Sequence, residues 1–147
     1  MTERHADRLS AMTELPVNQV ALSGRVTSAP LERRLPSGDT ILTFRVVVAR
    51  ERTPMTAKSR QSSDWVDCVA WGGRAKRSVS RWRVGDVVRL EGALRRRYLR
   101  GDAAVSTRVE VEVLGGRLLQ RAADPDRRAD LRRRAGRASP RPSAASA

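Results

Sequence analysis

The sequence predicts an all-β fold, in which five strands close into a small barrel and one short helix lies between the third and the fourth strand. Two observations support this prediction. In five segments between residues 17 and 116, apolar residues alternate with polar ones, as in strands with one buried face. Residues 72–86 instead carry apolar side chains at the spacing of an amphipathic helix. Five curled strands with a helix in this position are the arrangement of an OB-fold barrel.

The first three strands precede the helix. Residues 17–26 (VNQVALSGRV) alternate, and the strand that they form is expected to end near Pro30. Residues 40–50 follow a Pro-Ser-Gly turn and are predicted to form the second strand, whose buried face carries Leu42, Phe44, Val46 and Val48. The next segment, 51–63, is polar and too long for a tight hairpin turn, so we expect it to form a projecting loop. The third strand follows at residues 65–71.

The helix and the last two strands complete the barrel. Apolar residues at i, i+4 and i+7 predict the buried stripe of the helix, and these are Ala75, Val79 and Trp82. The helix is expected to end at Gly85. The fourth strand (86–99) and the fifth (104–116) each set an apolar face against a charged one. The residues expected on these two apolar faces are Val88, Leu90, Gly92 and Leu94, and Val109, Val111 and Val113.

Composition divides the chain into three zones. Residues 1–16 are polar and are predicted to form a flexible arm, whereas residues 17–120 form the folded domain. Residues 121–147 are rich in Arg, Ala, Ser and Pro and lack apolar periodicity. Such a segment buries too little apolar surface to offset the entropy lost on ordering, so a disordered tail is expected. Its eight Arg and three Asp give +5 of the net charge of +14, which leaves +9 on the rest of the chain.

The charge and the residue types narrow the functional classes. A net charge of +14 and a pI near 11.7 indicate a polyanionic partner. No apolar run approaches the ~18 residues that span a membrane, and no apolar export signal opens the chain. With one cysteine, Cys68, these features favour the cytoplasm. One histidine, His5, and no suitably spaced carboxylates leave no basis for an enzyme, a cofactor or a metal site.

Two of the three tryptophans lie in the stretch SDWVDCVAWGG (63–73). On a strand, one face of this stretch is small and wholly apolar and is therefore the better core face: Val66, Cys68 and Ala70. The other face carries Val69 and also Asp67, which a barrel interior would not accept unpaired. Trp65 and Trp71 share this second face, so we expect both rings to be displayed. They either stack nucleobases, worth about 1–3 kcal/mol per base, or pack beneath the loop or against a partner subunit.

Other side chains suit a single-stranded nucleic acid. Tyr98 follows three arginines at the end of the fourth strand, so we expect it to combine base stacking with phosphate contact. Phe44 and Trp82 are instead assigned to the core. Arginine outnumbers lysine 28 to 2, which adds bidentate phosphate binding and stacking. The basic residues selected as candidate contacts beside the two displayed tryptophans are Arg34, Arg45, Arg50, Arg52, Arg95 and Arg97.

Five segments, in this order, resemble the bacterial single-stranded DNA-binding protein (SSB) family. They are VNQVALSGRV, RRLPSG, DWVDCVAWGGRA, VGDVVRLEGALRRR and VEVEVLGG, and the resemblance covers about residues 17–118. It implies an OB fold, usually homotetrameric, that binds single-stranded DNA without sequence preference. It also places Trp65 and Trp71 at positions that stack bases, and Tyr98 close to a third such position. The short, arginine-rich form looks most like actinobacterial members.

Three features depart from the family pattern. Where the family often has an aromatic residue after the second strand, this chain has ARERT, with Arg50 and Arg52, so cationic contacts are expected instead. Family tails end in an acidic tip, whereas this one ends SPRPSAASA and is basic. We therefore do not expect the tail to recruit replication and repair enzymes, and we expect the protein to have an accessory role. Asp67 is unexpected between two base-stacking rings, and we expect an arginine of a neighbouring strand to neutralise it.

The combined expectation is a homo-oligomer, tetrameric or dimeric, that binds and protects single-stranded DNA in replication, repair or recombination. Two alternatives stay open. One is an OB-fold module for RNA or for a primosomal complex, in which the basic tail makes a second nucleic-acid contact. The other is an interaction protein whose tryptophans form a subunit interface.

Overall fold

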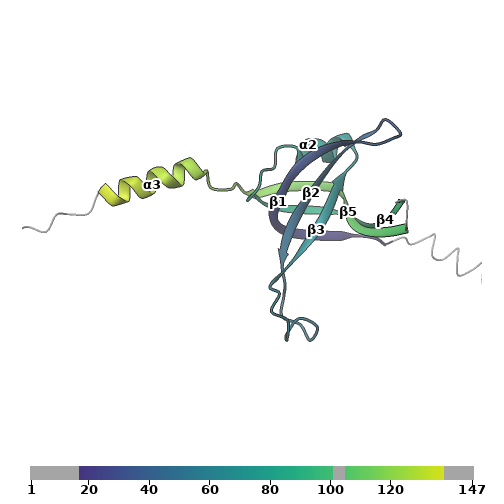
Figure 1. Cartoon of the computed structure of the whole chain (residues 1–147), viewed down its shortest axis with the longest axis horizontal. Coiled ribbons are helices and arrows are strands. Elements are labelled where there is room, and N and C mark those ends of the chain that lie inside the picture. The colour runs from purple at the N-terminus through teal and green to yellow at the C-terminus, as the bar shows by residue number, and fades with distance from the viewer. Residues whose placement is uncertain (1–16, 101–104, 138–147) are drawn as a thin grey trace, which may run out of the picture.

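The computed structural model of the protein describes residues 17–100 and 105–137. Five strands form a closed barrel in the order β1-β2-β3-β5-β4, with the short helix α2 between β3 and β4 in the chain (Figure 1). All neighbouring strands pair antiparallel except β3 and β5, which run parallel. This confirms the predicted OB-fold barrel. The elements are β1 (Val20–Arg34), β2 (Thr40–Ala49), β3 (Ser63–Ala70), α2 (Gly73–Val79), β4 (Val87–Arg100), β5 (Val105–Gln120) and α3 (Pro125–Arg137).

The apolar faces of the strands and of α2 meet inside the barrel. The helix stripe is buried as predicted, and Trp82 meets Phe44 edge-on, with ring centroids 5.5 Å apart and planes at 84°. A Cβ at Gly116 would lie 2.6 Å from the Trp82 ring, so the glycine leaves room for the indole. The buried cluster comprises Val26, Phe44, Val46, Cys68, Ala70, Ala75, Val79, Trp82, Val88, Leu90, Val111 and Val113.

The helix is shorter than predicted, and the turn after it ties down the end of β5. α2 ends at Val79, and Gly85 then adopts a φ of +92°, a left-handed conformation that favours glycine. The next residue, Asp86, is fully buried. Its carboxylate accepts hydrogen bonds from the Arg83 N–H at 2.8 Å, the Ala122 N–H at 2.7 Å and Arg121 Nη1 at 2.8 Å. Residues 121 and 122, predicted to begin the tail, are therefore attached to the barrel.

The hairpin of β4 and β5 extends beyond the barrel wall. Leu94 and Val109 have the inward parity that the sequence predicts, yet they are 51% and 50% exposed. These two side chains are exposed because no other strand covers them. β1 pairs with β4 only as far as Gly92, and β3 pairs with β5 only at Val111 and Glu112. The hairpin is consequently two-stranded beyond these points.

The first strand is longer than predicted. It continues through Pro30 to Arg34 instead of ending near the proline. Its register against β2 shifts between Val26 and Ser28 and again between Ser28 and Leu31. Such bulges leave a residue outside the hydrogen-bond ladder, so a proline, which has no N–H to donate, is accommodated there.

Two predicted loops form where expected. The turn between β1 and β2 contains Gly38 at a φ of +91°, and its Leu35 N–H donates to the Asp39 carbonyl at 2.8 Å. The segment between β2 and β3 projects from the barrel (Figure 1), and the Arg50 N–H closes its base on the Ser62 carbonyl at 2.9 Å. The predicted flexible arm at 1–16 lies outside the described residues.

The tail differs from its prediction. Part of the segment expected to be disordered forms α3, which extends away from the barrel (Figure 1). Its start has a helix cap, because the Asp124 carboxylate accepts the Asp126 N–H at 3.0 Å and Pro125 takes the first helical position. Residues 138–147 lie outside the described part of the chain. Among the described residues, no helix is long and apolar enough to cross a membrane.

Candidate nucleic-acid interface

The outer face of β3 displays both tryptophans. Trp65 is 60% exposed and Trp71, just after the strand, is 43% exposed. On the opposite face, Cys68 and Ala70 are buried and Val66 packs against the core cluster. One residue of the outer face departs from the prediction: Val69 is buried, because β3 is flanked there by β2 on one side and by β5 on the other.

An arginine lies against Trp65. The register of β2 and β3 sets Arg45 beside Asp67 and Val47 beside Trp65, all on the outer face. The Arg45 guanidinium carbon is 4.0 Å from the Trp65 ring centroid, and Arg45 Nε donates to Asp67 Oδ1 at 3.0 Å. Asp67 thus holds a cation over one face of the indole. The other face of Trp65 is the one left for a stacked ligand.

Asp67 has a second cationic partner from β5. Arg108 Nε lies 3.9 Å from Asp67 Oδ2, and the Asp67 side chain is only 18% exposed. The expectation that an arginine of a neighbouring strand neutralises Asp67 is therefore confirmed by both Arg45 and Arg108. Although Asp67 points outward, its charge is balanced by two guanidinium groups.

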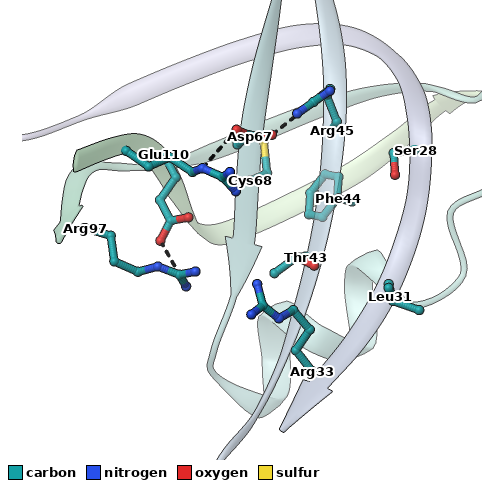
Figure 2. A pocket seen from close by; sticks show the side chains of 11 residues that line it. Ser28, Leu31, Arg33, Thr43, Phe44, Arg45, Asp67, Cys68, Arg97 and Glu110 are labelled. Carbon is teal, nitrogen blue, oxygen red and sulfur yellow. Dashed lines mark hydrogen bonds and ion pairs between the residues drawn. The ribbon is translucent and has the colours of Figure 1, made fainter. Parts of the chain in front are cut away.

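A polar hollow opens beside these residues, and all five strands contribute to it (Figure 2). Four arginines and two carboxylates line it, so its net charge is +2. Arg97 Nη1 of β4 lies 3.8 Å from the Glu110 carboxylate of β5, which is 7% exposed. Glu110 was predicted to lie on the charged outer face of the fifth strand. In the structure it lines the hollow and is buried. The lining residues are Ser28, Leu31, Arg33, Thr43, Phe44, Arg45, Asp67, Cys68, Arg97, Arg108 and Glu110.

Two further candidate arginines also have carboxylate partners. Arg50 forms a two-point ion pair with Asp64, in which Nε and Nη2 each lie 2.7 Å from a carboxylate oxygen. This hydrogen bonding raises the pKa of Arg50 and lowers the pKa of Asp64. Arg95 Nε donates to Glu112 Oε1 at 3.0 Å. A phosphate that binds either guanidinium therefore has to replace or share its carboxylate partner.

The remaining candidates are separated from this set. Arg34, at the end of β1, and Arg52, in the projecting loop, are exposed and pair with no described carboxylate. Tyr98 is 67% exposed on β4. Strand alternation puts its ring on the opposite face from Arg97, so Tyr98 does not line the hollow with Arg97.

Sequence reasoning did not select two residues that the structure brings to the hollow, Arg108 and Glu110. Both come from β5, which pairs with β3 although β4 lies between them in the chain. Charge alternation was visible in this strand, but nothing local indicated that it would lie beside β3. Within the described residues, His, Cys, Asp and Glu side chains nowhere gather in groups of three that could hold a metal ion.

A five-stranded barrel with a helix between β3 and β4, and a polar hollow across its strands, is an OB-fold binding domain. The model of the single-strand binding protein family matches residues 17–118, which include all of β1 to β4 and most of β5. The chain belongs to the single-strand binding protein family.

Relatives with curated descriptions are similar over part of the chain. Single-stranded DNA-binding protein A of Bacillus subtilis is 28% identical over 99 residues, which are 65% of this chain and 56% of that protein. Single-stranded DNA-binding protein 1 of Staphylococcus aureus is 31% identical over 81 residues, 55% of this chain and 47% of that protein. The chain spans about half the length of the curated relatives it matches.

A solved structure shares the fold. The Plasmodium falciparum SSB in complex with ssDNA superposes with a TM-score of 0.59 at 22% identity. The match covers 72% of this chain and 96% of that one. The similarity thus extends over nearly the whole of that chain and supports the fold described above.

Proposed function

We propose that this protein binds single-stranded DNA without sequence preference and protects it in replication, repair or recombination. The observation that carries the proposal is the exposure of Trp65 on β3 and of Trp71 just after it, with Arg45, one of the four arginines that line the hollow, lying against Trp65. Exposed rings beside guanidinium groups suit single strands, because every base has a face to stack and every nucleotide has a phosphate. Membership of the family supports the same function.

The ion pairs suggest how the phosphates are held. Arg45, Arg50, Arg95 and Arg97 are held in place by carboxylates before DNA arrives, which limits the entropy lost when a phosphate binds them. Binding then exchanges or shares an anionic partner. Bases would stack on Trp65 and Trp71, with Tyr98 on the projecting hairpin as a third ring. This role is one of binding and requires no catalytic group, cofactor or metal.

We further infer a homo-oligomer, tetrameric or dimeric, on nucleoid DNA in the cytoplasm. Leu94 and Val109, left exposed on the β4–β5 hairpin, support association with another subunit. The excess of arginine, 28 to 2 over lysine, supports an arginine-rich, actinobacterial-like subgroup. Recruitment of other enzymes through an acidic tip is not part of the proposal.

The test compares the wild type with a double variant, Trp65→Ala with Trp71→Ala. Because the remaining tryptophan, Trp82, is buried, binding is best followed by the anisotropy of a labelled oligo-dT. Loss of stacking is worth about 1–3 kcal/mol per base, so each ring removed should weaken binding by about fivefold to 150-fold. Unchanged affinity with an intact fold would contradict the stacking assignment.

Two additional measurements separate the alternatives. If the tryptophans form a subunit interface, the double variant should dissociate in sedimentation velocity experiments. If the protein is an RNA-binding or primosomal module, single-stranded RNA or a duplex should compete better than single-stranded DNA at the same salt concentration. For single-stranded DNA we expect the logarithm of affinity to fall with the logarithm of salt by about 0.7 for each phosphate neutralised.

A further inference from the structure

A second basic surface lies on the side of the barrel that α2 covers. Arginines from α2, from the turn after it and from the end of β5 line one hollow there. Trp82 lies at its base but is only 4% exposed. We call this surface the α2–β5 hollow. Its lining residues are Arg74, Arg77, Ser78, Arg81, Trp82, Gly116, Arg117, Leu118 and Arg121.

The charge of the α2–β5 hollow is unbalanced, unlike that of the hollow beside Trp65. No carboxylate lines it. Arg121 bonds to the buried Asp86, but the other four arginines form no ion pair with any carboxylate in the described ranges. In the hollow beside Trp65, by contrast, three of the four arginines pair with Asp67 or Glu110, and among the described ion pairs only Arg33 has none. The α2–β5 hollow thus holds more unpaired arginines than the hollow beside Trp65.

Local structure explains why these arginines gather. Arg74, Arg77 and Arg81 follow one another at i, i+3 and i+7, so they project from one side of α2 and of the turn that continues it. The buried stripe of Ala75 and Val79 holds the other side against the core. Arginines at this spacing repel one another, and a bound polyanion relieves that repulsion.

The chain places this surface next to the tryptophan face. Trp71 ends the display face of β3, and Arg74 follows it by three positions, at the start of α2. Three residues span at most about 11 Å, so the two surfaces adjoin at this point. Both Trp71 and Arg74 are exposed. A strand leaving Trp71 can therefore reach the arginines of α2 without crossing the barrel.

We propose that the α2–β5 hollow binds the phosphate backbone of the same single strand of DNA that stacks on Trp65 and Trp71. The inference rests on the proposed function and extends it to a second surface. With Trp82 buried, the hollow displays no ring, so it holds phosphates and stacks no base. Its contribution is therefore electrostatic, needs a strand longer than the tryptophan face can hold, and disappears at high salt.

The test is a triple variant, Arg74→Gln, Arg77→Gln and Arg81→Gln, in the full chain. All three side chains are exposed, so the fold should be kept, and thermal unfolding checks this. A matched control, Arg132→Gln, Arg133→Gln and Arg134→Gln, removes the same charge from α3, where these residues are also exposed. Each protein is titrated across salt concentrations with an oligo-dT of about 8 nucleotides, near one OB-fold site, and with one of about 40.

For the long oligonucleotide we expect the salt slope of the α2 variant to be smaller than that of the wild type by about two, or 0.7 for each of three phosphates. For the short oligonucleotide we expect unchanged affinity and tryptophan quenching. The α3 control should retain the wild-type slope. The inference is overturned by a wild-type slope in the α2 variant or by equal losses of slope in both triple variants. If the wild-type protein bound neither oligonucleotide, the result would instead contradict the proposed function itself.

Discussion

Asp67 offers the most direct test of the electrostatics of the tryptophan face. Its carboxylate accepts a hydrogen bond from Arg45 at 3.0 Å and lies 3.9 Å from Arg108. Asp67→Asn keeps the shape of the side chain and one oxygen acceptor for Arg45 but removes the negative charge. Two guanidinium groups then lack an anionic partner, and we expect single-stranded DNA to bind more tightly.

The size of the effect follows from the geometry. A phosphate on the far side of the Arg45 guanidinium would lie about 7 Å from the Asp67 carboxylate, where two unit charges repel by about 0.6–2.4 kcal/mol for effective dielectric constants of 80 to 20. Removal of that repulsion corresponds to about threefold to fiftyfold tighter binding at low salt. With both arginines free for phosphate, the salt slope should steepen by up to about 1.4.

The assay is an anisotropy titration of labelled oligo-dT over a range of salt concentrations. Asp130→Asn is the matched control, because it removes the same charge from an exposed position of α3. We expect the control to bind as the wild type does. If Asp67→Asn binds no more tightly than the wild type at low salt, with its thermal stability retained, then Asp67 does not oppose the phosphates. Its role would then be confined to positioning Arg45 over Trp65.

Two other predictions concern stability and thiol reactivity. Asp86→Asn replaces a charged hydrogen-bond acceptor, whose bonds are worth about 1.5–3 kcal/mol, with a neutral one and leaves a buried donor unpaired. We therefore expect urea denaturation to show that the free energy of unfolding falls by about 3 kcal/mol. Burial raises the pKa of Asp86, but the bonds from Ala122, Arg83 and Arg121 outweigh it and hold the pKa below its usual 3.8. The stabilisation is therefore present above about pH 4 and lost as the pH falls further, and the variant should lack this acid dependence. Burial, with the nearby charges of Asp67 and Glu110, raises the pKa of Cys68 to about 12, so alkylation at pH 8 should require unfolding.

The outcomes that would contradict these two predictions are distinct. If the free energy of unfolding of Asp86→Asn lies within about 1 kcal/mol of the wild-type value, which is an ordinary effect for a single substitution, then the three donors find other partners. For Cys68, equal alkylation rates in buffer and in urea would show that the barrel opens readily around β3.

Period-two alternation was sufficient to separate the two faces of β3. It predicted that Trp65 and Trp71 are displayed and that Cys68 and Ala70 are buried, because a strand's side chains alternate whatever its neighbours are. The same reasoning identified Phe44 in the core. Alternation could not predict burial where it depends on the extent of pairing, so Leu94 and Val109 have the expected parity and yet are exposed. A lack of apolar periodicity does not predict α3, because this helix packs no apolar stripe against the core cluster and is started by local signals at Asp124 and Pro125.

The strand count, the place of the helix, the core faces and the display of the two rings were predictable from the sequence, since all of these follow from local side-chain spacing. The ion pairs were not, because they depend on which strands become neighbours in the folded sheet. The parallel pairing of β3 with β5 brings Arg108 to Asp67, and the antiparallel pairing of β4 with β5 brings Arg97 to Glu110. Ion pairs between strands distant in the sequence depend on how the sheet closes. The same closure leaves the arginines of α2 without carboxylate partners in the described structure, beside the end of β5.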